Sequence, residues 1–186
     1  YRSKHESLIA FSNRQFYDSR LVTFPSAYSI DECYGVQFIH VPEGVYERSG
    51  RRCNPREAAV VVNHIFEHFS QYPNKSLGVV AFSQAQMQAI EDEVERRRLS
   101  QPQFEKYFKE DRLEGFFVKN LENVQGDERD VIFFSVGYGK DAAGKMSMNF
   151  GPLNREGGEK RLNVAITRAR EKVKLISSGK LYSELT

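Results

Sequence analysis

A continuous apolar run at residues 77–82, Leu-Gly-Val-Val-Ala-Phe, constrains the fold of this chain more than any other feature. Such a run, without polar alternation, is typical of a strand that is covered on both faces, as in a parallel sheet. Polar residues follow from Ser83, and a helix is predicted from there to Arg98. This order of strand, turn and helix is the βα unit of open α/β sheets, in which ligands bind at the carboxyl ends of the strands.

The rest of the chain supplies further strands and helices around this unit. From the apolar patterns we expect strands at 35–41, 115–118, 131–136 and 171–177, helices at 3–17, 55–72, 101–109 and 161–170, and loops at 18–34, 42–53 and 137–158. Alternating strands and helices predict one α/β domain over residues 1–186, with a parallel sheet covered by helices on both faces.

Local signals set the expected starts of two helices. Ser3 is followed by Glu6 three residues later, which is a capping box and predicts that the first helix begins at residue 3. Asn54 and Pro55 form the other signal, because asparagine caps helices well and proline suits the first helical position. The two helices should therefore begin close to residues 3 and 55.

The strand at 35–41 alternates apolar and polar residues. This pattern predicts that Val36 and Phe38, with Ile39 as a third candidate, face the core, whereas Gln37 and His40 face solvent.

Composition excludes several classes of protein. No apolar run approaches the roughly 20 residues that a membrane span needs, and no pattern indicates a signal peptide. Cys33 and Cys53 are too few for a disulfide framework or a cysteine metal site, so a reducing, cytoplasmic setting is expected. The net charge of +2 does not by itself indicate a polyanionic partner. Because the chain opens on Tyr-Arg without a methionine, we expect it to be a piece of a longer protein.

The segment at 161–177 carries the strongest functional pattern, a short helix that leads into a strand. Its apolar residues fall at helical spacing and can face a sheet: Leu162, Ala165, Ile166 and Ala169. Arg161, Thr167, Arg168 and Arg170 are then left to other faces. Guanidinium groups offer paired donors to phosphate oxygens and stay charged at any working pH, so this surface suits phosphate. A basic, solvated helix is the alternative interpretation.

This segment resembles the last conserved motif of superfamily 1 helicases, including its Thr-Arg-Ala core. In that family, the arginine that matches Arg168 reaches the γ-phosphate of an ATP held by the neighbouring RecA-like domain. The resemblance also implies nucleotide contact for Arg161 and nucleic-acid contact for Thr167. One motif alone is only a hypothesis, so the rest of the chain has to support it.

A second stretch, before the strand at 131–136, resembles the fifth helicase motif, Gln-Gly-x-Glu-x-Asp. Gln125, Gly126, Glu128 and Asp130 match it. In the family this turn contacts the ribose and phosphates of the nucleotide and links that site to the bound strand. The family's usual threonine, which contacts the nucleic acid, is Asn120 here. A solvated glycine turn would explain the same residues.

Two further matches are shorter. Tyr1 and Arg2 correspond to a family Tyr-Arg pair, whose tyrosine packs on the nucleotide base and whose arginine is a second phosphate ligand. The βα unit at 77–86 is similar to a motif that ends in glutamine, here Gln86. That motif contacts the strand, and the resemblance transfers the contact to Ser83, although the family's threonine, proline and tyrosine are replaced.

The three motifs occur in family order, and the resemblance covers most of the chain. It implies a three-layer RecA-like domain, the second motor domain of a 5′-to-3′ superfamily 1 helicase, within the P-loop NTPase superfamily. The chain would supply Arg168 and Arg2 to ATP and Mg²⁺ bound mainly by the first RecA-like domain of the same protein. It would also contact single-stranded nucleic acid, with DNA favoured over RNA. The alternative is a non-catalytic nucleic-acid-binding or docking module that keeps the fold.

Two other patterns match known sites by chance, in our interpretation. His64-x-x-Glu67-His68 is the inverted signature of zinc proteases, but a third ligand is missing and exposed polar residues on a helix explain it. Residues 139–146 nearly spell a phosphate loop, but Met146 replaces the hydroxyl that binds magnesium. We therefore predict no metal at the histidines and no phosphate loop in this chain.

Overall fold

The computed structural model describes residues 3–22, 34–109, 114–146 and 150–179. Five parallel strands form one sheet in the order β1-β5-β4-β2-β3. The elements are α1 (Ser7–Phe16), β1 (Gly35–His40), α2 (Pro55–Gln71), β2 (Leu77–Ala81), α3 (Gln84–Ser100), the 3₁₀ helix η1 (Pro102–Tyr107), β3 (Phe117–Asn120), β4 (Arg129–Ser135), the 3₁₀ helix η2 (Gly151–Asn154), α4 (Gly158–Ile166) and β5 (Ala169–Ser177).

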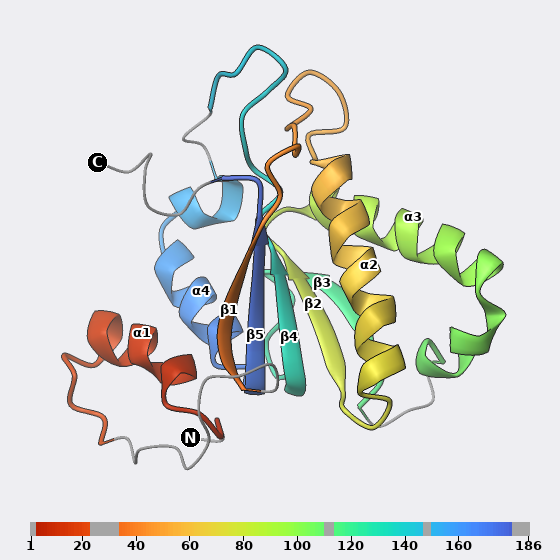
Figure 1. Ribbon diagram of the computed structural model, residues 1–186. Helices are drawn as coiled ribbons and strands as arrows, with labels where there is room; N and C mark the ends of the chain where they lie inside the picture. Colours follow the sequence, from red (N-terminus) through yellow and green to blue (C-terminus); the bar gives the residue numbers. More distant parts are fainter. Residues whose placement is uncertain (1–2, 23–33, 110–113, 147–149, 180–186) are drawn as a thin grey trace.

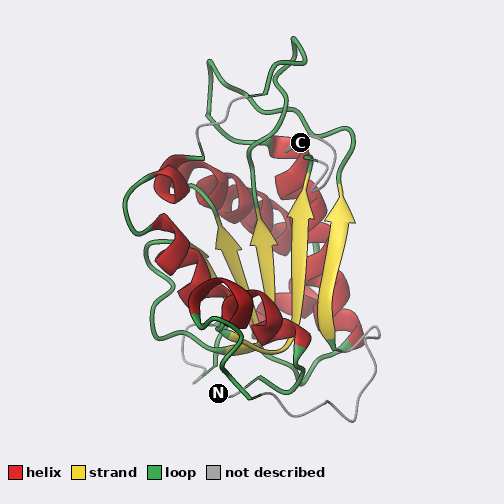
Figure 2. Ribbon diagram, turned by 90° about the vertical axis from the view of Figure 1, so that its left-hand side faces the viewer, coloured by secondary structure: helices red, strands yellow, loops and turns green. Residues whose placement is uncertain are grey.

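Helices cover both faces of the sheet. Helices α2 and α3 lie on one face, and α1 and α4 lie on the other (Figure 1). The strand arrows point toward one edge of the sheet (Figure 2), which we call the carboxyl edge, and the opposite side is the amino edge. The predicted α/β fold with a parallel sheet and two helical layers is confirmed.

The central strands β2 and β4 are buried on both faces, as the apolar run predicted. In β4, Val131 and Phe133 pack in the cluster beneath α2 and α3, whereas Ile132 and Phe134 pack in the cluster beneath α1 and α4. Full burial of a side chain of this size stabilises the fold by about 1.5–3 kcal/mol. The two clusters pack against opposite faces of the sheet and thereby fix the positions of the strand ends.

Two loops rise together beyond the carboxyl edge, one between β1 and α2 and the other between β4 and α4 (Figure 1). The amide of Tyr46 donates to the carbonyl of Lys140 over 2.9 Å, and the Arg48 guanidinium lies 3.2 Å from the Asp141 carboxylate. The connection from β3 to β4 has no helix. Residues 121–128 run from the carboxyl edge back to the amino edge, with Leu121 and Val124 buried on the way.

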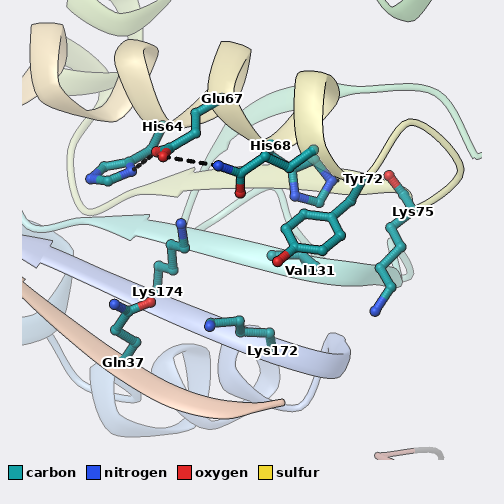
Figure 3. Close-up of a pocket in the computed structure, with 10 residues that line it drawn as sticks. Gln37, His64, Glu67, His68, Tyr72, Lys75, Val131, Lys172 and Lys174 are labelled. Atoms are coloured by element: carbon teal, nitrogen blue, oxygen red, sulfur yellow. Dashed lines mark hydrogen bonds and ion pairs between the residues drawn. The ribbon is translucent and has the colours of Figure 1, made fainter. Parts of the chain in front are cut away.

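Strand β1 contradicts the predicted burial pattern. Val36 is 46% exposed and Phe38 is 40% exposed, so neither belongs to the core. Gln37 is exposed, as predicted, and lines a cavity under α2 (Figure 3). The reason is position: β1 is an edge strand with β5 as its one neighbour, and the helical layer on the Val36 face does not reach over it fully.

The capping box at Ser3 and Glu6 was wrong. Helix α1 begins at Ser7, and no side chain caps it. The Ser3 hydroxyl donates to the carbonyl of Ala169 over 3.3 Å, so this residue ties the start of the chain to β5. The Ser3 side chain thus makes a long-range hydrogen bond to β5 rather than a local cap on α1.

Two predicted helices were also too long. The helix expected at 161–170 ends at Ile166, with Thr167 as its C-cap, and Ala169 already belongs to β5. The helix expected at 101–109 is the 3₁₀ helix Pro102–Tyr107. In the first case, pairing of residue 169 with Arg129 of β4 takes over from helical bonding.

His68 is buried, which corrects the expectation that both histidines of α2 lie on the surface. It is 4% exposed, its Nε2 lies 3.0 Å from the Lys75 carbonyl, and its ring meets Phe133 edge-on. The side chain of His64 is 24% exposed and its Nδ1 contacts Glu67 over 2.9 Å. Among the described residues, no three His, Cys, Asp or Glu side chains are grouped to hold a metal ion. In the same part of the chain, no helix is both long and apolar enough to cross a membrane.

A buried polar network holds the carboxyl edge together, and Gln86 is its centre. The backbone amide of Asn54 donates to Gln86 Oε1 over 2.8 Å. Gln86 Nε2 donates to Ser135 Oγ over 3.0 Å and to the backbone carbonyl of Asn54 over 3.3 Å. This glutamine therefore joins the starts of α2 and α3 to the end of β4. Its match to the helicase motif reflects a structural role.

Glu57 is the fully buried acid of the same network. Its carboxyl group accepts hydrogen bonds from the Ser135 hydroxyl (2.8 Å) and from the amides of Gly137 (2.7 Å) and Ser178 (3.1 Å). Burial raises the pKa of Glu57 to about 7, against the opposing effect of these donors. In the unfolded chain the ordinary pKa is about 4.5.

Because the folded state holds this proton more tightly, Glu57 should make stability depend on pH. Its contribution is fully present below about pH 4.5 and is lost as the pH rises through about 7. In the wild type, the free energy of unfolding should therefore fall by about 1–3 kcal/mol as the pH rises from 5 to 8. We expect Glu57→Gln to remove this fall. Urea titrations at several pH values measure it. Glu159→Gln, at an exposed position on α4, is the control, and equal pH slopes in wild type and Glu57→Gln would refute the assignment.

Candidate functional site

The end of α4 and the start of β4 meet at the amino edge of the sheet. The amide of Arg129 donates to the carbonyl of Arg168 over 3.1 Å, which sets the two motif segments side by side. Glu128, one residue earlier, then faces the Arg168 side chain, with Nη1 to Oε1 at 3.7 Å. The last motif and the glutamate of the fifth motif, far apart in the sequence, therefore form one cluster.

The Arg168 guanidinium is folded back on its own helix end. Its Nε donates to the carbonyl of Val164 over 2.9 Å, and its Nη2 donates to Thr167 Oγ1 over 3.2 Å. Thr167 in turn donates this hydroxyl to Val164. The arginine side chain is 22% exposed, so it lies at the surface and is held in a defined position.

Arg170 organises a second group of charges beside it. Its guanidinium contacts Glu114 at 2.7 Å, Asp130 at 3.5 Å and Glu128 at 4.0 Å. Asp130 also accepts bonds from the amide and the hydroxyl of Ser76, both at 2.9 Å. Burial alone would raise the pKa of Asp130, but the bonds from Ser76 and the charge of Arg170 hold it below the usual value.

The turn of the fifth motif presents its residues to solvent. Gln125 and Gly126 are exposed, and Gly126 has φ of +90°, which favours glycine. A Cβ added at Gly126 would meet nothing within 4 Å, so the backbone there is open to a ligand. Lys119 anchors the turn through an ion pair with Asp127 at 2.5 Å.

Tyr1 and Arg2, the other predicted nucleotide contacts, lie outside the described residues. The first residues described are bound to the same edge: the Lys4 amide donates to the carbonyl of Arg170 over 2.6 Å. Arg161 lies elsewhere, in the first half of α4, where its guanidinium donates to the carbonyl of Glu156 over 3.2 Å. The structure therefore does not bring Arg161 to Arg168.

The predicted strand contacts separate into two places. Ser83 caps α3 by accepting from the Gln86 amide, and Asn120 ends β3, with Nδ2 donating to Gln84 over 2.5 Å. Both lie at the carboxyl edge. Thr167 lies at the amino edge with Arg168, so the length of the sheet separates it from the other two.

Residues 140–146 form a small hairpin. Lys140 pairs with Met146 in an antiparallel bridge, and the Asp141 carboxylate accepts the amides of Ala143 and Lys145. In a phosphate loop, backbone amides point at phosphate and a helix follows directly. Here two of the backbone amides of the loop donate to the Asp141 side chain instead.

The sequence interpretation named Arg170 only as a basic residue near Arg168, and it missed Glu114 and Ser76 as part of the amino-edge cluster. A usable signal existed. Each residue lies at or just before the start of a strand, and the starts of parallel strands meet at one edge of the sheet.

Asp130 should support the position of β4 and Arg170 at neutral pH. Because its pKa is lowered in the folded state, its contribution is present above about pH 4 and is lost as the pH falls below that value. We expect Asp130→Asn to lower the free energy of unfolding at pH 7 by about 1–2 kcal/mol, with the difference shrinking toward pH 3.5. Urea unfolding measures it. Asp18→Asn, whose side chain is 82% exposed, is the matched control, and a variant as stable as wild type at pH 7 would contradict the argument.

Comparison with known proteins shows the family of the chain. A family model described as AAA domain (AAA_12) matches residues 1–180. A protein of Mycoplasma genitalium named uncharacterized ATP-dependent helicase MG140 is 36% identical over 183 residues, which are 97% of this chain and 16% of that protein. Its homolog in Mycoplasma pneumoniae is 36% identical over 184 residues, again 16% of its length. The chain thus spans less than a fifth of the curated relatives it matches.

A solved structure has the same fold. The C-terminal domain of a possible DNA helicase from Lactobacillus plantarum covers 97% of this chain, and the match covers 90% of that domain, with a TM-score of 0.52 and 15% sequence identity. The family model carries the assignment, and the solved structure supports the fold alone. The chain belongs to this AAA domain family, as a C-terminal RecA-like domain of the superfamily 1 helicase type.

Proposed function

We propose that this chain is the second motor domain of an ATP-dependent superfamily 1 helicase of the 5′-to-3′ type. In this proposal, Arg168 and Arg2 act as arginine fingers on an ATP held by the first RecA-like domain of the full-length protein. Gln125, Gly126 and Glu128 contact the nucleotide from the same edge. The observation that carries the proposal is the meeting of Arg168 with Glu128 at one exposed edge of the sheet.

The contacts of Arg168 suit a side chain that changes acceptors. Its two hydrogen bonds go to neutral oxygens, the Val164 carbonyl and the Thr167 hydroxyl, and its ionic partner Glu128 is 3.7 Å away. Hydrogen bonds to a charged phosphate are roughly twice as strong as those between neutral groups. A γ-phosphate presented by a neighbouring domain can therefore draw the guanidinium away from its own helix.

ATP and Mg²⁺ would be held mainly outside this chain. In the hairpin at residues 140–146, the Asp141 carboxylate occupies backbone amides that a phosphate loop would offer to phosphate. Thr167 and Arg168, at the amino edge, would provide hydrogen-bond donors for phosphate oxygens. When bound, the metal ion neutralises charge on the phosphates during transfer. The residues of this chain would orient the terminal phosphate and stabilise the charge that develops on it.

Single-stranded nucleic acid would cross the carboxyl edge, where Ser83 and Asn120 lie. We favour DNA over RNA as the strand, in keeping with the description of the similar solved domain as part of a possible DNA helicase. Thr167, at the other edge, would act with Arg168 on the nucleotide rather than on the strand. In this proposal the nucleotide binds at the amino edge of the sheet and the single strand binds at the carboxyl edge.

Arg168→Ala in the full-length protein should lower kcat for strand-stimulated ATP hydrolysis by ~10³ or more, because arginine fingers contribute ~10³–10⁵ in rate. Arg168→Lys should not restore it, since an ammonium lacks the planar pair of donors. Thermal stability should change little, because the side chain lies at the surface. Steady-state hydrolysis with and without a single strand, together with melting curves, measures both effects.

Arg155→Ala is the matched control, since Arg155 is 70% exposed and makes one long ion pair with Glu122 at 3.8 Å. Unchanged hydrolysis in Arg168→Ala would favour the alternative, a nucleic-acid-binding or docking module without catalysis. Unfolding of Arg168→Ala would assign the residue a structural role.

The 186-residue chain by itself should hydrolyse ATP no faster than a buffer blank. The reason is that the fingers act on an ATP that another domain holds. A coupled phosphate-release assay on the purified chain measures it. Turnover that survives further purification and disappears in Lys145→Ala would show that the hairpin binds phosphate after all.

A further inference from the structure

Three aromatic rings meet among the two loops that rise beyond the carboxyl edge (Figure 1). Tyr138, just after β4, is buried and only 7% exposed. The ring of Tyr46, from the loop after β1, has its centre 5.6 Å from the centre of the Tyr138 ring. The ring of Phe150, just before η2, lies at the same distance from Tyr138. Tyr46 and Phe150 are both partly exposed, so one buried ring supports two rings that reach the surface.

Backbone contacts hold these rings in place. The Tyr46 amide donates to the carbonyl of a residue in the neighbouring loop, Lys140, over 2.9 Å. The Phe150 amide donates to Asn154 Oδ1 over 2.6 Å. A Cβ added at Gly151 would overlap the Tyr138 hydroxyl, so the backbone of η2 lies directly against that ring. The rings thus form a surface that a ligand does not have to order, which lowers the entropy lost on binding.

The rings border the place that the proposed function gives to the single strand. Burial raises the pKa of Tyr138, and the side chain of Ser83 partly opposes this rise from close by. Ser83 is the residue at the end of β2 that is proposed to contact the strand. A strand that passes over Ser83 would therefore also meet the neighbouring rings.

Positive charge accompanies the rings on the same loops. Arg51 and Arg52 follow Tyr46 in the loop after β1, and both are exposed. Within the described part of the chain, neither guanidinium has an ion pair or a hydrogen bond. Across residues 42–56 and 140–146, Arg and Lys outnumber Asp and Glu by six to three. Proteins hold single strands with this combination, in which cationic groups contact phosphates and aromatic rings stack on bases.

We propose that Tyr46 and Phe150 form a stacking platform for bases of the single strand, and that Arg51 and Arg52 contact its phosphates. This inference rests on the proposed function, because it concerns the strand at the carboxyl edge. Every base has a π-face, so such a platform accepts strands of any sequence. Affinity for the strand should then depend on the bases themselves as well as on the phosphates. If the two rings only cover Tyr138, affinity should not depend on them.

The test measures binding of the full-length protein, without nucleotide, to two labelled strands by fluorescence anisotropy. One is an oligothymidylate, and the other is an abasic strand of equal length, which keeps the phosphates and lacks the bases. Tyr46→Ala and Phe150→Ala should each weaken oligothymidylate binding about 5- to 100-fold, the loss expected for one base stack, and leave binding of the abasic strand unchanged. Tyr46→Phe should bind like wild type, because it keeps the π-face.

Two further variants separate the rings from the charges. The double variant Arg51→Gln, Arg52→Gln should weaken binding of both strands and lower the salt dependence, with the slope of log K against log salt smaller by roughly 1–1.5. Tyr17→Ala is the matched control, because Tyr17 is a tyrosine that is 44% exposed at the end of α1. It should leave the binding of both strands unchanged.

Equal weakening of both strands by Tyr46→Ala would overturn the platform, since the ring would then not meet a base. Unchanged affinity in both ring variants would overturn it as well. If melting curves show that Tyr46→Ala is unfolded, Tyr46→Leu keeps the apolar bulk without the π-face and should show the same loss; wild-type affinity in that variant also counts against the platform. A protein that binds neither strand would refute the strand contact of the proposed function and the platform with it. Without nucleotide, none of these outcomes depends on Arg168.

Discussion

The pairing of β4 with β5 is the constraint on which the candidate site depends. One backbone bond, from the Arg129 amide to the Arg168 carbonyl, brings together two motifs that are separated by more than thirty residues in the chain. It can form because both strands are parallel and buried at the middle of the sheet, where packing on two faces leaves little freedom of register. The geometry of the Arg168 cluster at the amino edge is therefore set by buried core residues such as Phe133 and Val173.

The sequence was informative where burial is uniform or where a local cap decides. The apolar run of β2, the stripe of α2 and the Asn54 cap gave the sheet, the main helix and its start. The sequence misled where a distant partner decides. Ser3 bonds to Ala169 rather than capping its own helix, and Thr167 ends α4 because the next residues pair with β4. The alternation at Val36 and Phe38 correctly predicted a strand. It could not predict that this strand lies at the edge of the sheet, where both side chains are exposed.

The same distinction holds for the site. Order and spacing of the motifs predicted the family, which the family model confirms, and the site residues stay a prediction. Which residues meet could not be derived, because side-chain partners depend on the edge at which each segment ends. Thr167 and Asn120 were grouped by resemblance, yet they lie at opposite edges of the sheet. Gln86 was matched to the motif that contacts the strand, and the structure shows that its side-chain amide is hydrogen-bonded inside the domain.

The connection from β3 to β4 has a mechanical consequence. Eight residues, 121–128, cover the distance between the two edges, and a chain reaches at most about 3.3–3.6 Å per residue, or roughly 26–29 Å in all. A seven-residue strand such as β4 is itself about 23 Å long, and Leu121 and Val124 are fixed in the core. The length that the crossing does not need is taken up by two turns, in which the Asn123 amide donates to the Asn120 carbonyl and the Asp127 amide donates to the Val124 carbonyl. A displacement of one end of the sheet relative to the other would therefore be absorbed first by opening these two turns.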